Sequence, residues 1–490
     1  MKSLFVLSPR FLLPLIFIAL GISIWSLFSQ SIRLDESQSI WVSSKPLATV
    51  ISLTSTDVHV PLYGVILHFW MQIFGNSIVA ARALSMLFFI MTLPVLYLFV
   101  KEASNKQIAL LTLALFTLSP FIMWYTSEAR MYTLFTLITS LNHLFFLRMI
   151  KSDAGQSKFG YFVTLILGFY THYFFVFLVM TQAVYTVGVF WKRLQNKESQ
   201  RFVKRTIGIM FVAALFFLPW IGLLLSSGMA SNSQPLIPPP TSYNIIQTFV
   251  NFIFGFQAQG IQAVLVSLWP LSVMTLFFIF TKRQRIPISG TVYILLASFL
   301  PIILVFLVSY FRPIFLSRYL IVVTPTLFFL FAWMLTQYSQ KATSLVISVV
   351  LFSMLGLMLY QTTSAATPVR ENYEGATAYL EQKATARDII AVTAPFTVYP
   401  IEYSYDGRTR ITTIPEWNRF EAGAIPAFSV QDLDTRMSKY KTQYERMFLI
   451  MSYDQGYEDE IRKYFDGYEL LEKDTLSAKL EIRVYKLRYN

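Results

Sequence analysis

Long apolar runs recur between residues 11 and 361, and they set the architecture of the chain. Most of them are long enough to cross the hydrocarbon core of a bilayer, which is roughly 30 Å thick. A soluble fold could not bury this much apolar surface, so the pattern predicts a mainly α-helical, polytopic membrane protein with about 11 transmembrane helices. The predicted spans are residues 11–28, 78–100, 107–123, 130–149, 159–171, 173–190, 205–225, 262–281, 288–309, 317–337 and 343–361.

Two segments between the spans have their own character. The apolar segment PLYGVILHFWMQIFG, which begins at Pro61, is too short to cross and predicts a helix that lies in the outer interface or dips into the membrane. The connection from Ser226 to Gly260 contains PLIPPP, and its length marks it as a candidate lid or acceptor-binding segment.

The pattern changes near Ala366. Helical periodicity in ENYEGATAYLEQK is followed by the strand-like DIIAVTA and RMFLIMSY, the helical YEDEIRKYF, and the strand-like YELLEKD and LEIRVYKLR. We therefore predict two domains, a transmembrane domain over residues 1–365 and a small C-terminal α/β domain over residues 366–490.

Basic residues give the orientation. They crowd the loops on one face, which the positive-inside rule assigns to the cytoplasm. The alternation requires residues 159–190 to form a hairpin of two short helices, broken near Thr171 and His172. Because the number of predicted spans is odd, the C-terminal domain is predicted to lie on the extracytoplasmic side. We predict that the first span is not cleaved. The N-terminus also resembles a secretory signal, but cleavage would leave Asp35 close to a new chain end.

Composition narrows the function further. The chain is 55% hydrophobic and 17% aromatic, with a mean hydropathy of +0.53. Before residue 366 there are 23 Lys and Arg against 7 Asp and Glu; after it the net charge is −3. The basic pI of about 9.6 thus belongs to membrane loops, and no nucleic-acid partner is implied. The chain has no cysteine, which excludes disulfides and thiolate metal sites.

Unusual polar residues collect on the outer face of this topology, close to span ends. Ionisable groups at membrane depth are costly and are usually functional. A carboxylate there can take a proton from a hydroxyl, and fork-shaped arginines can hold a phosphate that leaves as an anion. The set therefore indicates glycosyl transfer from a lipid-phosphate donor. Its members are Asp35, Glu36, Tyr125, Glu128, Arg130, His59, His172, Arg312 and Arg318.

Five segments carry a resemblance to a known family. LDESQ, DVHVPLYGVILHFW, SPFIMWYTSEARMYTL, FYTHYFFVFL and FLSRYLIVVTP resemble successive blocks of the GT-C membrane glycosyltransferases of the protein-mannosyltransferase and aminoarabinose-transferase type. The resemblance covers roughly residues 1–340. One departure is Val60, which stands where the family usually has the first of two prolines. The resemblance implies a polyprenyl-phosphate sugar donor, an outer-leaflet site, inversion at the anomeric carbon and Asp35 as the catalytic base.

Each candidate has a role and an ordinary alternative. We predict Asp35 and Glu36 as catalytic, although Glu36 could instead pair with a cation. Arg318, Arg130 and His59 are predicted to bind the donor phosphate, although an arginine before a span often only snorkels to the interface. The remaining site candidates are Glu128, His172, Tyr125 and Arg312. Glu128 could merely complement a helix dipole, His172 could satisfy backbone groups at a helix break, and Tyr125 could belong to an aromatic belt.

The predicted function is an inverting glycosyltransferase, a hexosyl- or pentosyltransferase, in a plasma (inner) membrane. Its acceptor would be a hydroxyl on a protein, a glycolipid or a polysaccharide. No cofactor is certain; two carboxylates and a histidine are ligands that could hold a divalent metal ion, and the sequence leaves this open. The alternatives are a glycolipid transporter or flippase, and a ligase of whole lipid-linked glycans.

Overall fold

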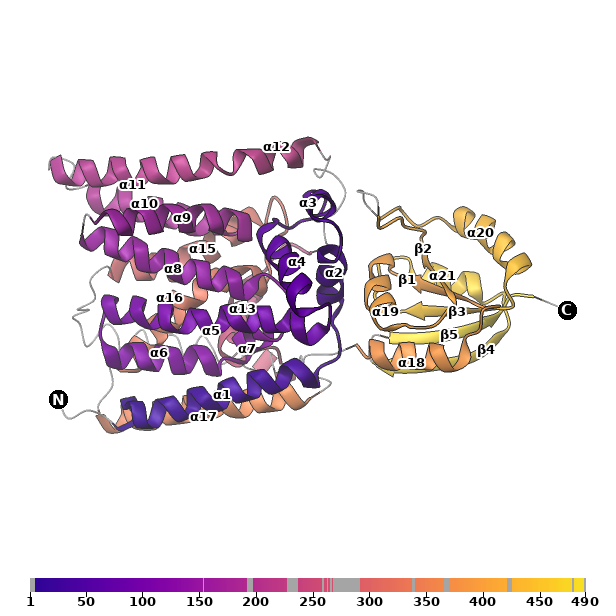
Figure 1. Ribbon diagram of the computed structural model, residues 1–490. Helices are drawn as coiled ribbons and strands as arrows, with labels where there is room; N and C mark the ends of the chain where they lie inside the picture. The colour runs from indigo at the N-terminus through magenta and orange to yellow at the C-terminus, as the bar shows by residue number, and fades with distance from the viewer. Residues whose placement is uncertain are drawn as a thin grey trace.

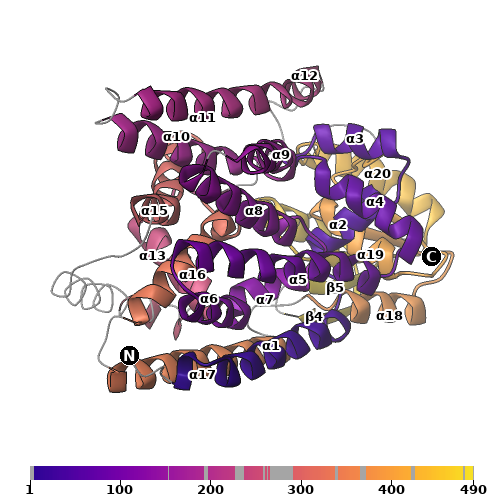
Figure 2. The same cartoon turned by 60° about the vertical axis from the view of Figure 1, so that its left-hand side comes forward.

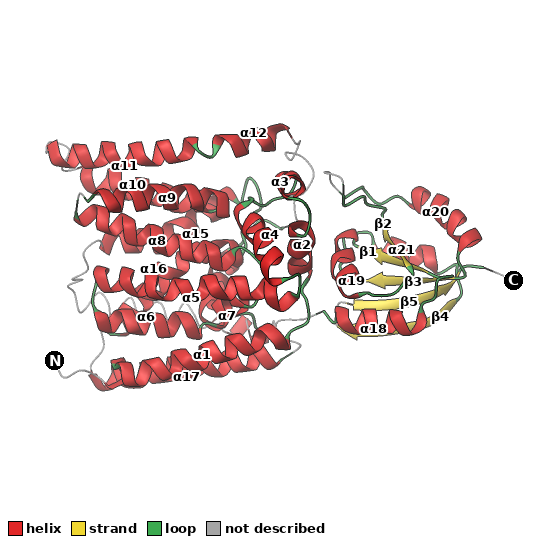
Figure 3. Ribbon diagram, in the orientation of Figure 1, coloured by secondary structure: helices red, strands yellow, loops and turns green. Residues whose placement is uncertain are grey.

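The computed structural model describes residues 5–488, except 153, 192–196, 227–236, 258–259, 262, 265–266, 268–290, 337–339, 365–370, 421–424 and 478–479. In these residues the molecule has two parts, a bundle of long helices and a smaller domain at one end of it (Figure 1). All described strands lie in the smaller domain (Figure 3).

The bundle consists mostly of helices that run side by side along one axis (Figure 1). Its members are α1 (Pro9–Ser29), α5 (Ile78–Ala103), α6 (Lys106–Leu118), α7 (Pro120–Thr126), α8 (Tyr132–Lys151), α9 (Gly155–Thr171), α10 (Phe175–Trp191), α11 (Lys197–Leu215), α12 (Leu218–Ser226), α13 (Ser242–Phe254), α15 (Thr291–Val308), α16 (Thr324–Leu335) and α17 (Gln340–Thr363). α1 and α17 pack along one side, as Figure 2 also shows.

The membrane character of the bundle is confirmed. Among the described residues, six helical segments are long and apolar enough to cross a membrane, or seven if α6 and α7 form one bent span. Helices lie at the predicted places, except that the span predicted at 262–281 falls largely outside the described residues. The predicted break near His172 is present, because α9 ends at Thr171 and α10 begins at Phe175. The total of about 11 spans and the side that each loop faces stay predictions.

The bend between α6 and α7 follows from two adjacent residues. Ser119 ends α6 and caps α7, because its hydroxyl accepts a hydrogen bond from the amide of Ile122. Pro120 begins α7, at the first helical position, where its missing N–H costs nothing. The two helices meet at 66°. The following loop, residues 127–131, lies against the segment that carries Asp35 and Glu36, because Ala129 and Arg130 donate hydrogen bonds to these two residues.

Three short helices cover that end of the bundle: α2 (Leu34–Ser43), α3 (Leu47–Ser55) and α4 (Leu62–Phe74) (Figure 1). α4 is the helix predicted after Pro61. Its 13 residues span about 20 Å, which is too short to cross a membrane. A 3-10 helix, η2 (Ser317–Val323), precedes α16 and brings Arg318 to the same end.

The smaller domain is built on a five-stranded sheet of order β2-β1-β3-β5-β4. β1 (Ile389–Thr393) pairs in parallel with β2 (Arg410–Ile414) and β3 (Arg446–Met451), and β5 (Leu480–Lys486) is antiparallel to β3 and β4 (Leu470–Ser477). One face packs on α18 (Tyr373–Lys383) and α19 (Val398–Ser404), and the other on α20 (Val430–Gln443) and α21 (Glu458–Phe465).

This arrangement agrees with the predicted α/β character of the C-terminal region. The strands and helices predicted from residue 371 onward are present, whereas β2, α19 and α20 were not predicted. The domain boundary predicted at 365/366 lies outside the described residues.

Candidate active site

Asp35 and Arg318 meet at the end of the bundle below the smaller domain. Asp35 lies in the first turn of α2, and Arg318 lies near the start of η2. The Arg318 guanidinium donates a hydrogen bond of 3.3 Å to the Asp35 carboxylate, and both side chains are about one third exposed, at 38% and 31%. Asp35 and Arg318, which belong to separate blocks of the sequence, thus lie side by side at a solvent-accessible place.

Glu36, the neighbour of Asp35, points into the protein instead. Its side chain is fully buried with that of Arg82 on α5, and the two form a bidentate pair with N–O distances of 2.8 and 2.7 Å. Glu36 also accepts hydrogen bonds from the backbone amides of Arg33 and Ala129. All its acceptor positions face donors, and no part of the carboxylate is left for a substrate.

Arg82 ties the same region to the backbone of the α1–α2 connection. Its guanidinium donates to the carbonyls of Leu27, Gln30 and Ser31 at 2.8 to 3.1 Å. The five donors of one buried arginine therefore fix the start of α2 and, with it, the direction of Asp35.

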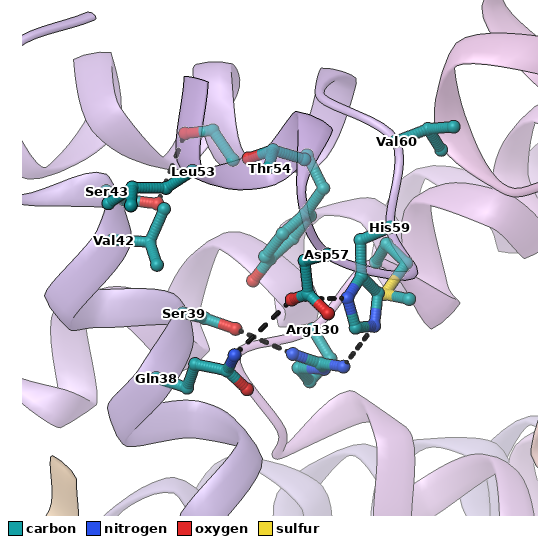
Figure 4. Close-up of a pocket in the computed structure, with 13 residues that line it drawn as sticks. Gln38, Ser39, Val42, Ser43, Leu53, Thr54, Asp57, His59, Val60 and Arg130 are labelled. Carbon is teal, nitrogen blue, oxygen red and sulfur yellow. Dashed lines mark hydrogen bonds and ion pairs between the residues drawn. The ribbon is translucent and has the colours of Figure 1, made fainter. Parts of the chain in front are cut away.

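A second chain of contacts joins Arg130 to the segment after α3. Arg130 donates to the backbone carbonyl of Asp35 at 3.4 Å and to the Ser39 hydroxyl at 3.3 Å. Its other terminal nitrogen lies 2.6 Å from Nε2 of His59, whose Nδ1 lies 3.0 Å from Asp57 (Figure 4). Because arginine can only donate, Nε2 of His59 accepts and Nδ1 carries the proton toward Asp57.

This pairing bears on the role predicted for His59. Both ring nitrogens are engaged, one by Arg130 and one by Asp57. His59 would have to exchange a partner before it could donate to a phosphate. In this arrangement it orients Arg130 instead.

A small pocket adjoins this chain. It has a volume of about 60 Å³ and lies between α2, α3, α4 and Arg130 (Figure 4). Gln38, Asp57 and His59 line it, and Gln38 donates to Asp57 at 3.3 Å. The pocket has room for a few water molecules or one small polar group.

Glu128, in the loop after α7, forms an ion pair with Arg33, which lies directly before α2. The carboxylate lies 3.3 Å from the guanidinium, which also lies 3.5 Å from the centre of the Trp124 ring. Both charged side chains are largely buried. Glu128 therefore lies in the wall of the site, next to the loop that carries Arg130.

The remaining predicted site residues are His172, Tyr125 and Arg312. His172 stacks on Phe135 at 4.8 Å and accepts a hydrogen bond from the amide of Phe174, as its ordinary interpretation at a helix break requires. Tyr125 is buried against Tyr132, with ring centroids 4.6 Å apart. Arg312 is exposed, six residues before Arg318 and ahead of η2.

Burial and nearby charges together set the ionisation of three acids at the site, Asp35, Asp57 and Glu128. Burial alone would raise the pKa of Asp35, but Arg130 and Arg318 outweigh it and hold this pKa below its usual value. Burial also opposes ionisation of Asp57, yet His59 lowers the pKa of Asp57 to about 2. Burial dominates at Glu128 and raises its pKa to about 7, despite Arg33.

Sequence reasoning did not select Asp57 or Arg82. Asp57 stands two residues before His59 in the DVH segment, and this short separation could have indicated that the two side chains pair. Arg82 stands alone among apolar residues in a span, which is itself a signal of a buried partner. In the part of the chain that the structure describes, no three His, Asp or Glu side chains cluster so as to hold a metal ion.

Comparison with known proteins agrees with this picture. The family model of dolichyl-phosphate-mannose-protein mannosyltransferases matches residues 58–222, which include His59, Glu128 and Arg130. No curated protein sequence matches the chain significantly.

Solved structures share the fold over nearly the whole chain. ArnT from Cupriavidus metallidurans in the apo state matches with a TM-score of 0.60 and 12% identity, over 97% of this chain and 98% of that one. ArnT bound to undecaprenyl phosphate matches with a TM-score of 0.60 and 10% identity, over 98% of each chain. The Archaeoglobus fulgidus oligosaccharyltransferase in complex with Zn and sulfate matches with a TM-score of 0.50 and 14% identity, over 89% of this chain and 67% of that one.

These matches confirm the resemblance that the five sequence blocks indicated. The protein is a multi-pass membrane protein with the fold of the GT-C membrane glycosyltransferases.

Proposed function

We propose that this protein is an inverting glycosyltransferase that moves a sugar from a polyprenyl-phosphate donor to an acceptor hydroxyl at the extracytoplasmic face of the membrane. The observation that carries the proposal is the contact between Asp35 and Arg318 at the end of the helix bundle that faces the smaller domain, with Arg130 beside it. A base and two phosphate-binding groups then lie where a lipid-borne donor would present its headgroup. The fold shared with ArnT bound to undecaprenyl phosphate supports a donor of this kind.

The site residues divide the reaction between them. The isoprenoid tail stays among the apolar helices, and the Arg318 guanidinium, with help from Arg130, takes the donor phosphate. When Arg318 turns to the phosphate, it releases the Asp35 carboxylate from its present contact. Asp35 is then free to act as a base.

The chemical step is one displacement. Asp35 accepts the proton of the acceptor hydroxyl as that oxygen attacks the anomeric carbon from the side opposite the phosphate. A new bond forms between the anomeric carbon and the acceptor oxygen, the bond to the phosphate oxygen breaks, and the polyprenyl phosphate leaves as an anion held by Arg318. Inversion at the anomeric carbon follows from this in-line geometry.

In the proposed reaction Glu36 has a positioning role and does not act as a base. Its four contacts with Arg82, Arg33 and Ala129 leave it no capacity to accept a further proton donor. We assign it to holding α2 and assign the base role to Asp35 alone. His59, joined to Asp57, orients Arg130 in the same way.

The finer assignments belong to the same proposal. The donor would carry a hexose or a pentose, and the acceptor would be a protein, a glycolipid or a polysaccharide. The protein would lie in a plasma membrane, with its C-terminal domain outside.

A transfer assay tests the proposal. Purified protein would be incubated with a panel of polyprenyl-phosphate hexoses and pentoses and with membrane acceptors, and mass spectrometry of the copurifying lipid would identify the donor. We expect product with wild-type protein and at least about 100-fold slower formation of product with Asp35→Asn. A glycolipid transporter would move lipid across vesicles without forming product, and a ligase would accept only donors that carry a whole glycan. Product formed by Asp35→Asn at close to the wild-type rate would refute the assignment of the base.

A further inference from the structure

The helix that carries Asp35 lies between the two parts of the molecule. In Figure 1, α2 faces the bundle on one side and α19 of the C-terminal domain on the other, and the two helices are in contact. Trp41 follows Asp35 by six residues, which is about 120° around the helix axis. The helix therefore presents the acidic pair to the bundle and Trp41 to the domain.

The half-buried Trp41 ring contacts side chains of the C-terminal domain and of its own neighbourhood. Its centroid lies 5.2 Å from that of Tyr399 and 5.3 Å from that of Phe420. The ammonium of Lys45 lies 4.3 Å from its centre, and the guanidinium of Arg419 lies 5.9 Å from it. Rings at these distances attract one another, and so do cations over a ring. We call these five residues the Trp41 clamp.

The domain's share of the clamp comes from the carboxyl ends of two parallel strands. Tyr399 belongs to α19, which follows β1, and Arg419 and Phe420 lie in the segment after β2. Arg419 is ion-paired with Glu402 of α19, which fastens that segment to the helix. The carboxyl edge of such a sheet is the usual place for a ligand. Here the half-buried Trp41 ring lies against side chains that follow this edge.

Two more contacts join the domain to the supports of Asp35. The Ser31 hydroxyl donates to the backbone carbonyl of Glu371 at 3.2 Å, and the carbonyl of Ser31 accepts from Arg82. The Tyr403 hydroxyl donates at 3.2 Å to the carbonyl of Asn76, just ahead of the helix that carries Arg82. All three connections thus end on segments that hold Asp35 and Glu36 in place.

We infer that the C-terminal domain positions the catalytic base, and that Trp41 is the positioning residue through which it acts. The inference rests on the proposed function, because it assigns Asp35 the role of the base. An isolated helix of ten residues is unstable in water, so α2 takes its direction from what it packs against. A misplacement of about 1 Å at a reacting group can cost roughly 100-fold in rate. Loosening the clamp should therefore slow the reaction without touching the phosphate site.

Two substitutions loosen the clamp from opposite sides. Trp41→Ala removes the ring, and Phe420→Ala removes one partner whose side chain is exposed, so that the domain should still fold. Trp41→Phe keeps an aromatic ring and should recover most of the activity. Phe428→Ala is the matched control, because Phe428 stacks on Tyr457 and packs against the face of the sheet that α20 and α21 cover, whereas Tyr399 lies on α19.

We expect Trp41→Ala to lower kcat by about 10- to 100-fold. Phe420→Ala should lower it by less, and the double variant should be no worse than Trp41→Ala, because both changes break one interaction. The Kd for undecaprenyl phosphate should stay within about twofold of the wild-type value in every variant. Phe428→Ala should leave both quantities unchanged.

Hydrogen exchange on the full-length protein gives a readout that needs no substrate. The amides of Leu34–Ser43 should exchange at least about tenfold faster in Trp41→Ala and Phe420→Ala, and at the wild-type rate in Phe428→Ala. Unchanged exchange, unchanged kcat, or an effect confined to the KM for the acceptor would each overturn the inference. If wild-type protein transfers no sugar while the exchange responds as described, the proposed function fails and the clamp is only a structural link.

Discussion

The guanidinium of Arg318 lies 3.3 Å from the carboxylate of Asp35, although 283 residues separate the two in the chain. The contact closes the site, because it joins the first short helix of the chain to the segment that precedes one of its last spans. It also helps to keep a partly buried carboxylate ionised, since Arg130 and Arg318 together outweigh the effect of burial on the pKa of Asp35. In the proposed reaction the contact is exchanged for one between Arg318 and phosphate.

Replacing Asp35 by Asn should slow sugar transfer by at least about 100-fold. The amide keeps the size of the side chain but cannot accept the acceptor's proton, and removal of a general base typically costs about 10²- to 10⁴-fold in rate. Binding of undecaprenyl phosphate should be retained, because Arg318 and Arg130 are untouched. The measurement is kcat together with lipid binding. Glu102→Gln, in a pair with Arg148 away from the site, is the control and should be fully active.

Replacing Arg318 should weaken binding of the donor. A hydrogen bond to a charged group contributes about 1.5–3 kcal/mol, so Arg318→Ala should raise the Kd for undecaprenyl phosphate by roughly 10- to 100-fold. Arg318→Lys should recover only part of this, because an ammonium group cannot bind phosphate as a planar fork. Titration calorimetry or a fluorescent lipid competitor would measure the effect. An unchanged Kd in Arg318→Ala would mean that another group holds the phosphate.

Breaking the buried pair of Glu36 and Arg82 should destabilise the whole protein. Arg82→Ala leaves the Glu36 carboxylate buried without its principal partner, which typically costs about 3–5 kcal/mol. The apparent Tm and the yield in detergent should fall together with activity. Arg148→Ala, which breaks a partly exposed pair, should change the Tm far less. A normal Tm in Arg82→Ala with lost activity would indicate a direct role in the reaction.

The sequence predicted the elements that depend on local pattern. The lengths of the apolar runs predicted where the helices lie. The order of the five blocks predicted that Asp35 and Arg318 lie at the same end of the bundle. The sequence could not predict the pairing of Glu36 with Arg82, because these residues are 46 positions apart and meet only when the helices pack. Two adjacent acids looked alike in the sequence, and the rotation of about 100° from one helical residue to the next gives them different surroundings, with Asp35 partly exposed and Glu36 buried.

The interface with the C-terminal domain could not be predicted from the sequence for the same reason. Trp41 lies in a short polar helix, and its partners Tyr399 and Phe420 lie more than 350 residues away in segments without a distinctive pattern. Aromatic residues are frequent in this chain, so no single one stood out before the fold placed them together.

Glu128 should make the stability of the protein depend on pH. Burial raises its pKa from 4.5 to about 7, so the folded protein binds this proton more tightly than the unfolded chain does. Below about pH 4.5 the group is protonated in both states and contributes no difference. As the pH rises toward 7 the unfolded chain ionises first, so the folded state loses stability, by roughly 3 kcal/mol at most.

Glu128→Gln isolates this effect, because glutamine resembles the protonated acid and has no proton to lose. The apparent Tm of the variant minus that of the wild type should increase as the pH rises from about 4.5 to 7, and should level off above that range. Taking the difference removes the influence of all other titrating groups. A difference that stays constant across this range would show that Arg33 keeps Glu128 ionised in the folded protein, and that the ion pair prevails over burial in the wall of the site.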